Sequence, residues 1–261
     1  MITLVRVELL KLRTTRTAAG LLAAAVGISL LWCFLEASRA GTVSAVPALS
    51  TSAGQTTIIT GGVWSLLLAA VLGVLVTSGE FRHATVTSTY LATPDRKRVL
   101  AAKAIASAIG GAVYGSAGWL VATGVGLGYA VAQSDHVLIS AATLARFAAG
   151  HVLAGALLGA AGAGLGALIR SQVPAVILVF VWGIIIESLL GGLFTGLRPY
   201  LPYTAATTLA GTAPGNASFG AARAVATGAP LPFAAAAALV AAVAVVLLIA
   251  AGRTTVRRDI T

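Results

Sequence analysis

The chain has 261 residues, of which 58% are hydrophobic and 9% are charged, and its mean hydropathy is +0.98. Its long apolar segments lack the polar stripe of a helix on the surface of a soluble protein, so the composition excludes a soluble globular domain. The formal net charge of +10 lies in short loops between these segments, which indicates contact with anionic lipid headgroups and no nucleic-acid partner.

The first 17 residues combine apolar and basic side chains at helical spacing. Ile2, Val5, Leu9 and Leu12 recur along them with basic residues in between. We predict an amphipathic helix that lies on the membrane surface, with a flexible basic tail as the alternative. The apolar segment that follows is longer than the core of a signal peptide and precedes a poor cleavage site, so we predict that it is an uncleaved first span.

Six apolar segments follow one another along the chain. Each is long enough, or nearly so, to cross a hydrocarbon core of roughly 30 Å as a helix. They cover residues 18–35, 61–77, 99–132, 144–169, 173–194 and 231–251. We therefore predict an all-α membrane protein with six transmembrane helices in a single domain, residues 1–261. Glycines recur in the third and fourth segments, at intervals that let helices approach closely in lipid.

Positive charge falls mainly on one side of these segments. With six spans both termini lie on the same side, and that side holds 13 of the 17 Lys and Arg residues. The other side holds Arg39, Arg146, Arg198 and Arg223. Because positive residues stay in the cytoplasm, we predict that both termini are cytoplasmic. On the outer side, the polar and Ser/Thr-rich stretch 36–60 is predicted to be a loop without regular structure.

The predicted cytoplasmic loop 78–98 carries a cluster of polar residues at each end. A turn or helix cap is expected at Asp95, after Pro94. The end of the loop carries three consecutive basic residues, which alone would be an ordinary lipid anchor. Because the start of the same loop carries an acidic, an aromatic and two basic or imidazole side chains in succession, we predict a surface that docks a partner. Anchoring to lipid headgroups is the alternative for both. The first cluster consists of Glu80, Phe81, Arg82 and His83, and the second of Arg96, Lys97 and Arg98.

Glu187 is the acidic residue that lies well inside an apolar segment. An ionisable group there costs about 2.5–3.5 kcal/mol on insertion scales, so it usually faces a bundle interior or a cavity. His151, in the preceding segment, lies at a similar depth, roughly 10 Å below the outer surface by the helical rise. We identify Glu187, His151 and, about a turn further out, Arg146 as a candidate intramembrane polar site. The site would be either a point on a translocation path or a structural hydrogen bond between helices.

Three stretches resemble the permease subunit of the bacterial type-2 ABC exporters. Residues 7–16 (VELLKLRTTR) resemble the interfacial N-terminal helix of that family. Residues 80–89 (EFRHATVTST), followed by 91–94 (LATP) and 98–103 (RVLAAK), resemble its first cytoplasmic loop. The plan of six spans with a long last outer loop is also similar.

The resemblance implies a place in the bacterial plasma membrane and two protein partners. Permeases of this family form dimers, with a second copy or a paralogue, and each docks a separate ATP-binding cassette subunit through the loop 78–98. The first polar cluster would form the coupling contact, with the basic triplet nearby. In the outer loop 196–230 the family has short re-entrant helices, which 205–210 and 219–227 would match, and a loop without helices is the alternative.

The chain has no nucleotide site of its own that its sequence reveals. None of its three lysines follows a glycine as in a phosphate-binding loop, so ATP and Mg would be bound by the partner subunit, and we expect neither a cofactor nor a catalytic site here. The resemblance favours ATP-driven export of a hydrophobic or amphipathic compound, such as a drug, an antibiotic or a lipid. The alternatives are a transporter driven by an ion gradient, with Glu187 as proton site, and a membrane sensor that recruits an ATPase without transport.

Overall fold

The structure is a computed structural model that describes residues 1–42, 46–82, 85, 87, 89, 91, 93–134, 136–212 and 229–254. Within these residues every element of secondary structure is helical. Six helices are long and apolar enough to cross a membrane, and each overlaps one of the six predicted segments, so the all-α fold with six such helices is confirmed. They are Arg16–Arg39, Ser52–Arg82, Arg96–Ala132, Ala141–Ile169, Gln172–Leu193 and Phe233–Thr254.

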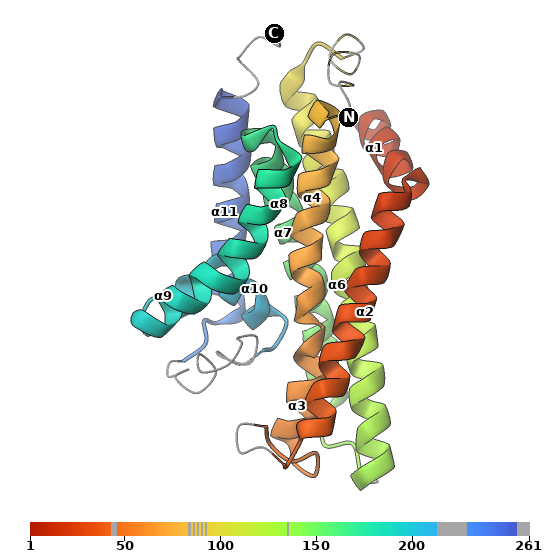
Figure 1. Cartoon of the computed structure of the whole chain (residues 1–261), viewed down its shortest axis with the longest axis vertical. Helices are drawn as coiled ribbons and strands as arrows, with labels where there is room; N and C mark the ends of the chain where they lie inside the picture. Colours follow the sequence, from red (N-terminus) through yellow and green to blue (C-terminus); the bar gives the residue numbers. More distant parts are fainter. Residues whose placement is uncertain are drawn as a thin grey trace.

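The elements can be followed in chain order in Figure 1. The second span consists of α3, η1 and α4 in succession, and the fifth consists of α8, the π-helical segment η2 and α9. The bounds are α1 (Ile2–Thr14), α2 (Arg16–Arg39), α3 (Ser52–Ile59), η1 (Thr60–Val63), α4 (Trp64–Arg82), α6 (Arg96–Ser134), α7 (Ala141–Ile169), α8 (Gln172–Phe180), η2 (Val181–Ile186), α9 (Glu187–Leu193), η3 (Arg198–Tyr200), α10 (Pro202–Leu209) and α11 (Phe233–Thr254).

The prediction of a loop without regular structure over 36–60 is wrong. Helix α2 continues into this stretch, and α3 begins within it. Thr51 caps α3, because its hydroxyl accepts a hydrogen bond from the backbone N–H of Gly54 at 3.1 Å. The polar composition that suggested a loop therefore serves in part to begin a helix.

Gln55 explains why α3 packs in this place. Its side chain is fully buried and donates to the carbonyl oxygens of Leu49 at 3.2 Å and His136 at 3.0 Å. It also accepts a hydrogen bond from the backbone N–H of Leu138 at 2.9 Å. A buried amide must be satisfied in this way, so Gln55 fixes α3 against the segment that joins α6 and α7.

The centre of the molecule is α4, most of which is buried between the other helices. A Cβ atom added to Gly111 of α6 would lie 2.1 Å from the carbonyl oxygen of Gly155 in α7. A Cβ atom at Gly73 of α4 would lie 2.0 Å from the carbonyl oxygen of Gly159. The predicted close approach of helices through small residues is confirmed at these crossings.

Replacing Gly111 by alanine is expected to destabilise the bundle by about 1–3 kcal/mol, because α6 and α7 must move apart to accept one methyl group. Thermal unfolding of the detergent-solubilised chain measures this loss. Gly20→Ala is the matched control, since nothing lies within 4 Å of a Cβ atom at Gly20. Equal melting temperatures for the two variants would contradict the packing described here.

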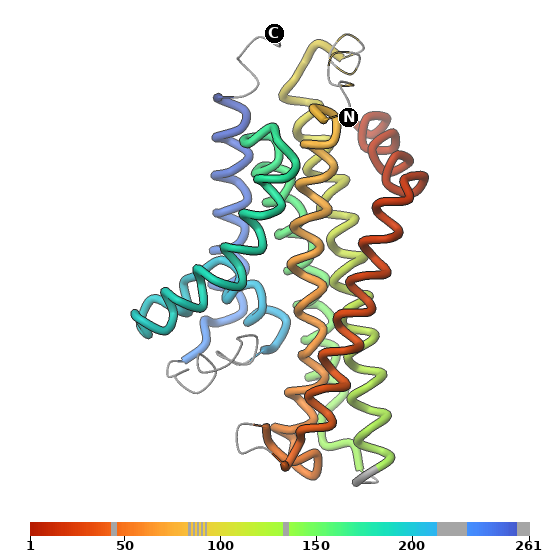
Figure 2. The backbone as a smooth tube through the Cα atoms, in the orientation of Figure 1, coloured from red at the N-terminus to blue at the C-terminus, as the bar shows by residue number. Residues whose placement is uncertain are grey.

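The two ends of the bundle differ in construction. Figure 2 shows that α1 turns sharply away from α2 and lies at the same end of the molecule as the last residues of α11. The fifth span leans away from α4 towards the opposite end, and the chain then returns through η3 and α10. Tyr203, Ala206 and Leu209 of α10 pack in the main hydrophobic core with residues of α4, α7 and α11. This return places α10 inside the bundle.

Candidate functional site

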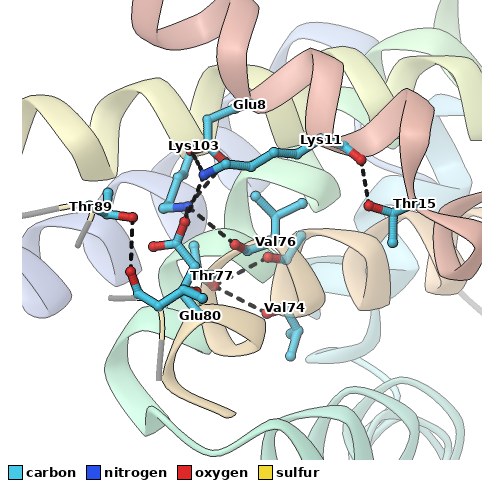
Figure 3. Close-up of polar contacts among 11 residues, drawn as sticks. Glu8, Lys11, Thr15, Val74, Val76, Thr77, Glu80, Thr89 and Lys103 are labelled. Atoms are coloured by element: carbon cyan, nitrogen blue, oxygen red, sulfur yellow. Dashed lines mark hydrogen bonds and ion pairs between the residues drawn. The ribbon is translucent and has the colours of Figure 1, made fainter. Parts of the chain in front are cut away.

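Four charged side chains from three helices form a closed ring, which we call the charge cluster (Figure 3). It consists of Glu8 and Lys11 of α1, Glu80 of α4 and Lys103 of α6. The Nζ atom of Lys103 lies 2.7 Å from Oε1 of Glu80 and 3.0 Å from Oε2 of Glu8. The Nζ atom of Lys11 lies 2.8 Å from Oε1 of Glu8 and 2.9 Å from Oε1 of Glu80. Each carboxylate thus contacts both ammonium groups.

The local sequence explains how the ring closes. Glu8 and Lys11 are three residues apart and share one face of α1. Glu80 lies in the last turn of α4, and Lys103 lies near the start of α6, so the two residues flank the loop between these helices. The side chains of Glu8 and Lys103 are only 8% and 6% exposed, and charges so buried are stable only when they are paired.

The ring also changes the proton affinity of Lys11, its most exposed member. Partial burial alone would lower the pKa of the Lys11 ammonium group. The hydrogen bonds and charges of Glu8 and Glu80 outweigh this effect and raise that pKa above its usual value. Lys11 therefore stays protonated, and the two positive and two negative charges of the ring balance.

The next two residues of α4 contact a different part of the molecule. The guanidinium group of Arg170 lies over the ring of Phe81, with 5.7 Å between its central carbon and the ring centroid. Arg82 donates a hydrogen bond from Nη1 to Oε1 of Gln172 at 3.2 Å. The end of α4 thus contacts α1 through Glu80 and the connection between α7 and α8 through Phe81 and Arg82.

The other predicted residues of the loop have separate places. His83 lies outside the described residues. Asp95 caps α6, as predicted, since its Oδ1 accepts a hydrogen bond from the backbone N–H of Arg98 at 3.1 Å. The Arg98 side chain also forms an ion pair with this carboxylate, with 3.0 Å between its Nε atom and Oδ2 of Asp95. Lys97 and Arg98 are exposed and Arg96 is partly buried, so the basic triplet presents positive charge at the surface.

Glu8 and Lys103 are not among the residues predicted for the candidate site. Two signals could have identified them. Glu8 is the sole acidic residue among the first 35, within a basic and apolar helix. Lys103 lies inside the predicted third span, where a cation needs a partner. The ring also leaves the Glu80 side chain only 11% exposed, directed towards α1 and α6.

Glu187 forms a second polar site, at the N-terminus of α10. Its Oε1 accepts hydrogen bonds from Nε1 of Trp182 at 3.0 Å and from the backbone N–H of Tyr203 at 2.7 Å. Its Oε2 accepts from the backbone N–H and the hydroxyl of Thr204 at 2.8 and 2.9 Å. Helix α10 has no side-chain cap of its own, and this carboxylate supplies one from another helix.

The hydrogen bonds of Glu187 and of His151, two members of the predicted intramembrane polar site, do not join the two residues. His151 is fully buried, and its Nδ1 lies 2.9 Å from the carbonyl oxygen of Phe147, one turn earlier in α7. Arg146 is exposed on the same helix. The carboxylate of Glu187 binds Trp182, Tyr203 and Thr204, while Nε2 of His151 has no hydrogen-bond partner among the described residues.

Within the described residues, no group of three or more His, Cys, Asp and Glu side chains is placed to hold a metal ion. The charge cluster joins helices through ion pairs, and Glu187 joins helices through hydrogen bonds. No known protein family and no curated protein matches this chain.

Proposed function

We propose that the chain is the membrane-spanning subunit of an ATP-binding cassette exporter, which exports a hydrophobic or amphipathic compound with ATP hydrolysed by a separate subunit. The observation that carries the proposal is the charge cluster. Glu80 and Lys103 flank the loop that resembles the coupling loop of type-2 ABC exporters, and both bind α1. An ATPase docked on this loop would therefore move α1, α4 and α6 together.

The proposed orientation places both termini in the cytoplasm of a bacterial cell, with the chain in the plasma membrane. In this orientation α1 lies on the headgroups of the inner leaflet. Its exposed apolar side chains support that place, since Ile2 is 74%, Val7 46% and Leu10 61% exposed. Leu12, by contrast, packs against the bundle. Helix α1 would thus contact membrane lipid on one face and protein on the other.

On the outer side, α10 is proposed to be a re-entrant element before the last span. It covers Pro202–Leu209 where the sequence suggested 205–210, and its residues are largely buried. The second suggested piece, 219–227, lies outside the described residues. The four hydrogen bonds to Glu187 would hold such an element in place.

A second permease copy, or a paralogue, is proposed to pack against α2 and α6. These helices form a groove lined by Gly27, Phe34, Gly124, Gly128 and Tyr129. Nothing lies within 4 Å of a Cβ atom at any of these three glycines, in contrast to the glycines between α6 and α7. A partner helix could approach this face as closely as α7 approaches α6.

The hydrogen bonding of Glu187 disfavours a transporter driven by a proton gradient. A proton site must exchange its proton with water, whereas Glu187 is 3% exposed and its two oxygen atoms accept four hydrogen bonds. A helix-capping role accounts for this carboxylate without proton transfer.

Isolation of the chain from its native membrane in mild detergent, followed by mass spectrometry, tests the proposal. We expect a stoichiometric partner that carries the phosphate-binding sequence Gly-x-x-x-x-Gly-Lys-Ser/Thr. Absence of such a partner, under conditions that preserve a known ABC complex, would favour the gradient-driven transporter. A partner ATPase without nucleotide-dependent export in the reconstituted complex would favour the sensor.

Arg82→Ala is expected to weaken docking of that ATPase by about 1 kcal/mol or more, roughly fivefold in the dissociation constant, because an exposed arginine is a common anchor of an interface. Titration of the purified subunits measures the change. Arg39→Ala removes an exposed arginine at the opposite end and is expected to have no effect. Unchanged docking of the Arg82 variant would exclude Arg82 from the contact.

A further inference from the structure

A partly open cavity of about 270 Å³ lies between α4, α7, α11, the fifth span and α10. Leu67, Ala161, Trp182, Tyr203 and Leu247 are among the residues that line it. We propose that this cavity binds the hydrocarbon tail of the exported compound, with a size of about ten carbon atoms. This inference rests on the proposed function, since it specifies the class of compound that is exported.

The chemistry of the wall selects an apolar occupant. Two side chains in the wall carry polar groups, and both groups already have partners. Nε1 of Trp182 donates to Glu187 at 3.0 Å, and the hydroxyl of Tyr203 donates to the carbonyl oxygen of Val63 at 3.2 Å. The other lining residues are aliphatic, proline or glycine. A polar ligand group would lose its water here without gaining a hydrogen bond, whereas a hydrocarbon chain has no such cost.

The size and shape of the cavity suit a chain of moderate length. An apolar cavity of about 150 Å³ stays dry and holds benzene, so 270 Å³ has room for roughly eleven carbon atoms by proportion. Leu158, Ala161 and Leu165 line it along one face of α7, and seven residues of helix span roughly 10 Å. A space of this length accepts an extended chain of that size.

The depth of the cavity distinguishes a bound compound from the lipid that surrounds the protein. Its innermost wall is formed by Leu67 and Ala70 of α4, which are 3% and 7% exposed. Lipid tails that coat the outer faces of the helices do not reach these residues. An occupant of the cavity must pass between the spans to reach α4, as a compound that is taken up for export would do.

Photolabelling of the full chain in phospholipid nanodiscs tests the proposal. The probe is decane that carries a diazirine group, and mass spectrometry locates the labelled peptides. We expect saturable labelling of Leu67 and Ala70, which unlabelled decane suppresses. Ala161→Leu fills the cavity and is expected to weaken this labelling about tenfold or more. The matched control is Ala160→Leu, an adjacent and partly exposed position outside the cavity, and it is expected to have no effect.

Val243→Phe narrows the same cavity from α11 and serves as the second variant if Ala161→Leu does not fold. Absence of α4 labelling, or equal labelling of the filled and control variants, would overturn the proposal. A second set of nanodiscs carries the diazirine on the phospholipid tails. Labelling of Leu67 and Ala70 in these nanodiscs would assign the cavity to bilayer lipid and would also overturn it. Neither assay involves an ATPase, so a failure here differs from a failure to find the partner subunit.

Discussion

Replacing Lys103 by methionine is expected to destabilise the folded chain by about 3–5 kcal/mol, the usual cost of removing one partner from a buried ion pair. Methionine has a similar length but no charge, so Glu8 and Glu80 would remain close together with Lys11 as their shared cation. Lys11 is 47% exposed, and its charge is screened more than that of Lys103. Unfolding of the detergent-solubilised chain by heat or denaturant measures the loss.

Two further variants separate this effect from the loss of a positive charge in general. Lys97→Met removes an exposed lysine at the start of the same helix and is expected to change stability very little. Adding Glu80→Gln to the Lys103→Met chain restores the charge balance of the ring and is expected to recover part of the stability. A Lys103→Met chain as stable as the Lys97 variant would contradict the role assigned to the charge cluster.

Replacing Glu187 by glutamine is expected to loosen α10. The glutamine amide has one accepting oxygen, and its NH₂ group faces at least one backbone or indole N–H, so at least one of the four hydrogen bonds is lost and the others lose their charged acceptor. Bonds to a charged group contribute about 1.5–3 kcal/mol each, so local opening of α10 becomes easier by about 3 kcal/mol. Hydrogen–deuterium exchange at the backbone amides of Tyr203 and Thr204 should accelerate on the order of a hundredfold.

Thr204→Val is the graded control for this experiment. It removes only the hydroxyl bond to Glu187 and leaves the other three, so exchange at Tyr203 should accelerate by a factor of about ten. Unchanged exchange in the Glu187→Gln chain would mean that the carboxylate does not hold α10. A variant that folds but no longer exports would place α10 on the translocation path.

Hydropathy was sufficient to predict the six spans, because each buries or exposes to lipid an almost unbroken run of apolar side chains. The glycine spacing predicted where helices approach closely, and the Gly111–Gly155 crossing confirms it. The helix cap at Asp95 was predictable because a cap is formed with a backbone N–H group only three residues further along the chain.

The contacts between distant segments could not be predicted in the same way. Glu8 and Lys103 are 95 residues apart, and their pairing depends on the angle at which α1 leaves α2. The similar depth of Glu187 and His151 in their helices suggests that the two side chains meet. Hydropathy does not reveal that the short helix α10 packs in the core and binds Glu187 instead. The polar residues of 36–60 predict a loop because the caps and buried amides of short helices have the same composition as loops.

The charge cluster also imposes an order on the assembly of the protein during synthesis. Glu8, Lys11 and Glu80 leave the ribosome before Lys103, so the two carboxylates share a single cation until the third span emerges. Until then, the Lys11–Glu80 ion pair is the member of the ring that joins α1 to α4, and the contact of α1 with α6 forms only after Lys103 is made. A nascent chain that ends before residue 103 would hold its N-terminal helix through the Lys11–Glu80 pair alone and would leave one negative charge of the cluster unbalanced.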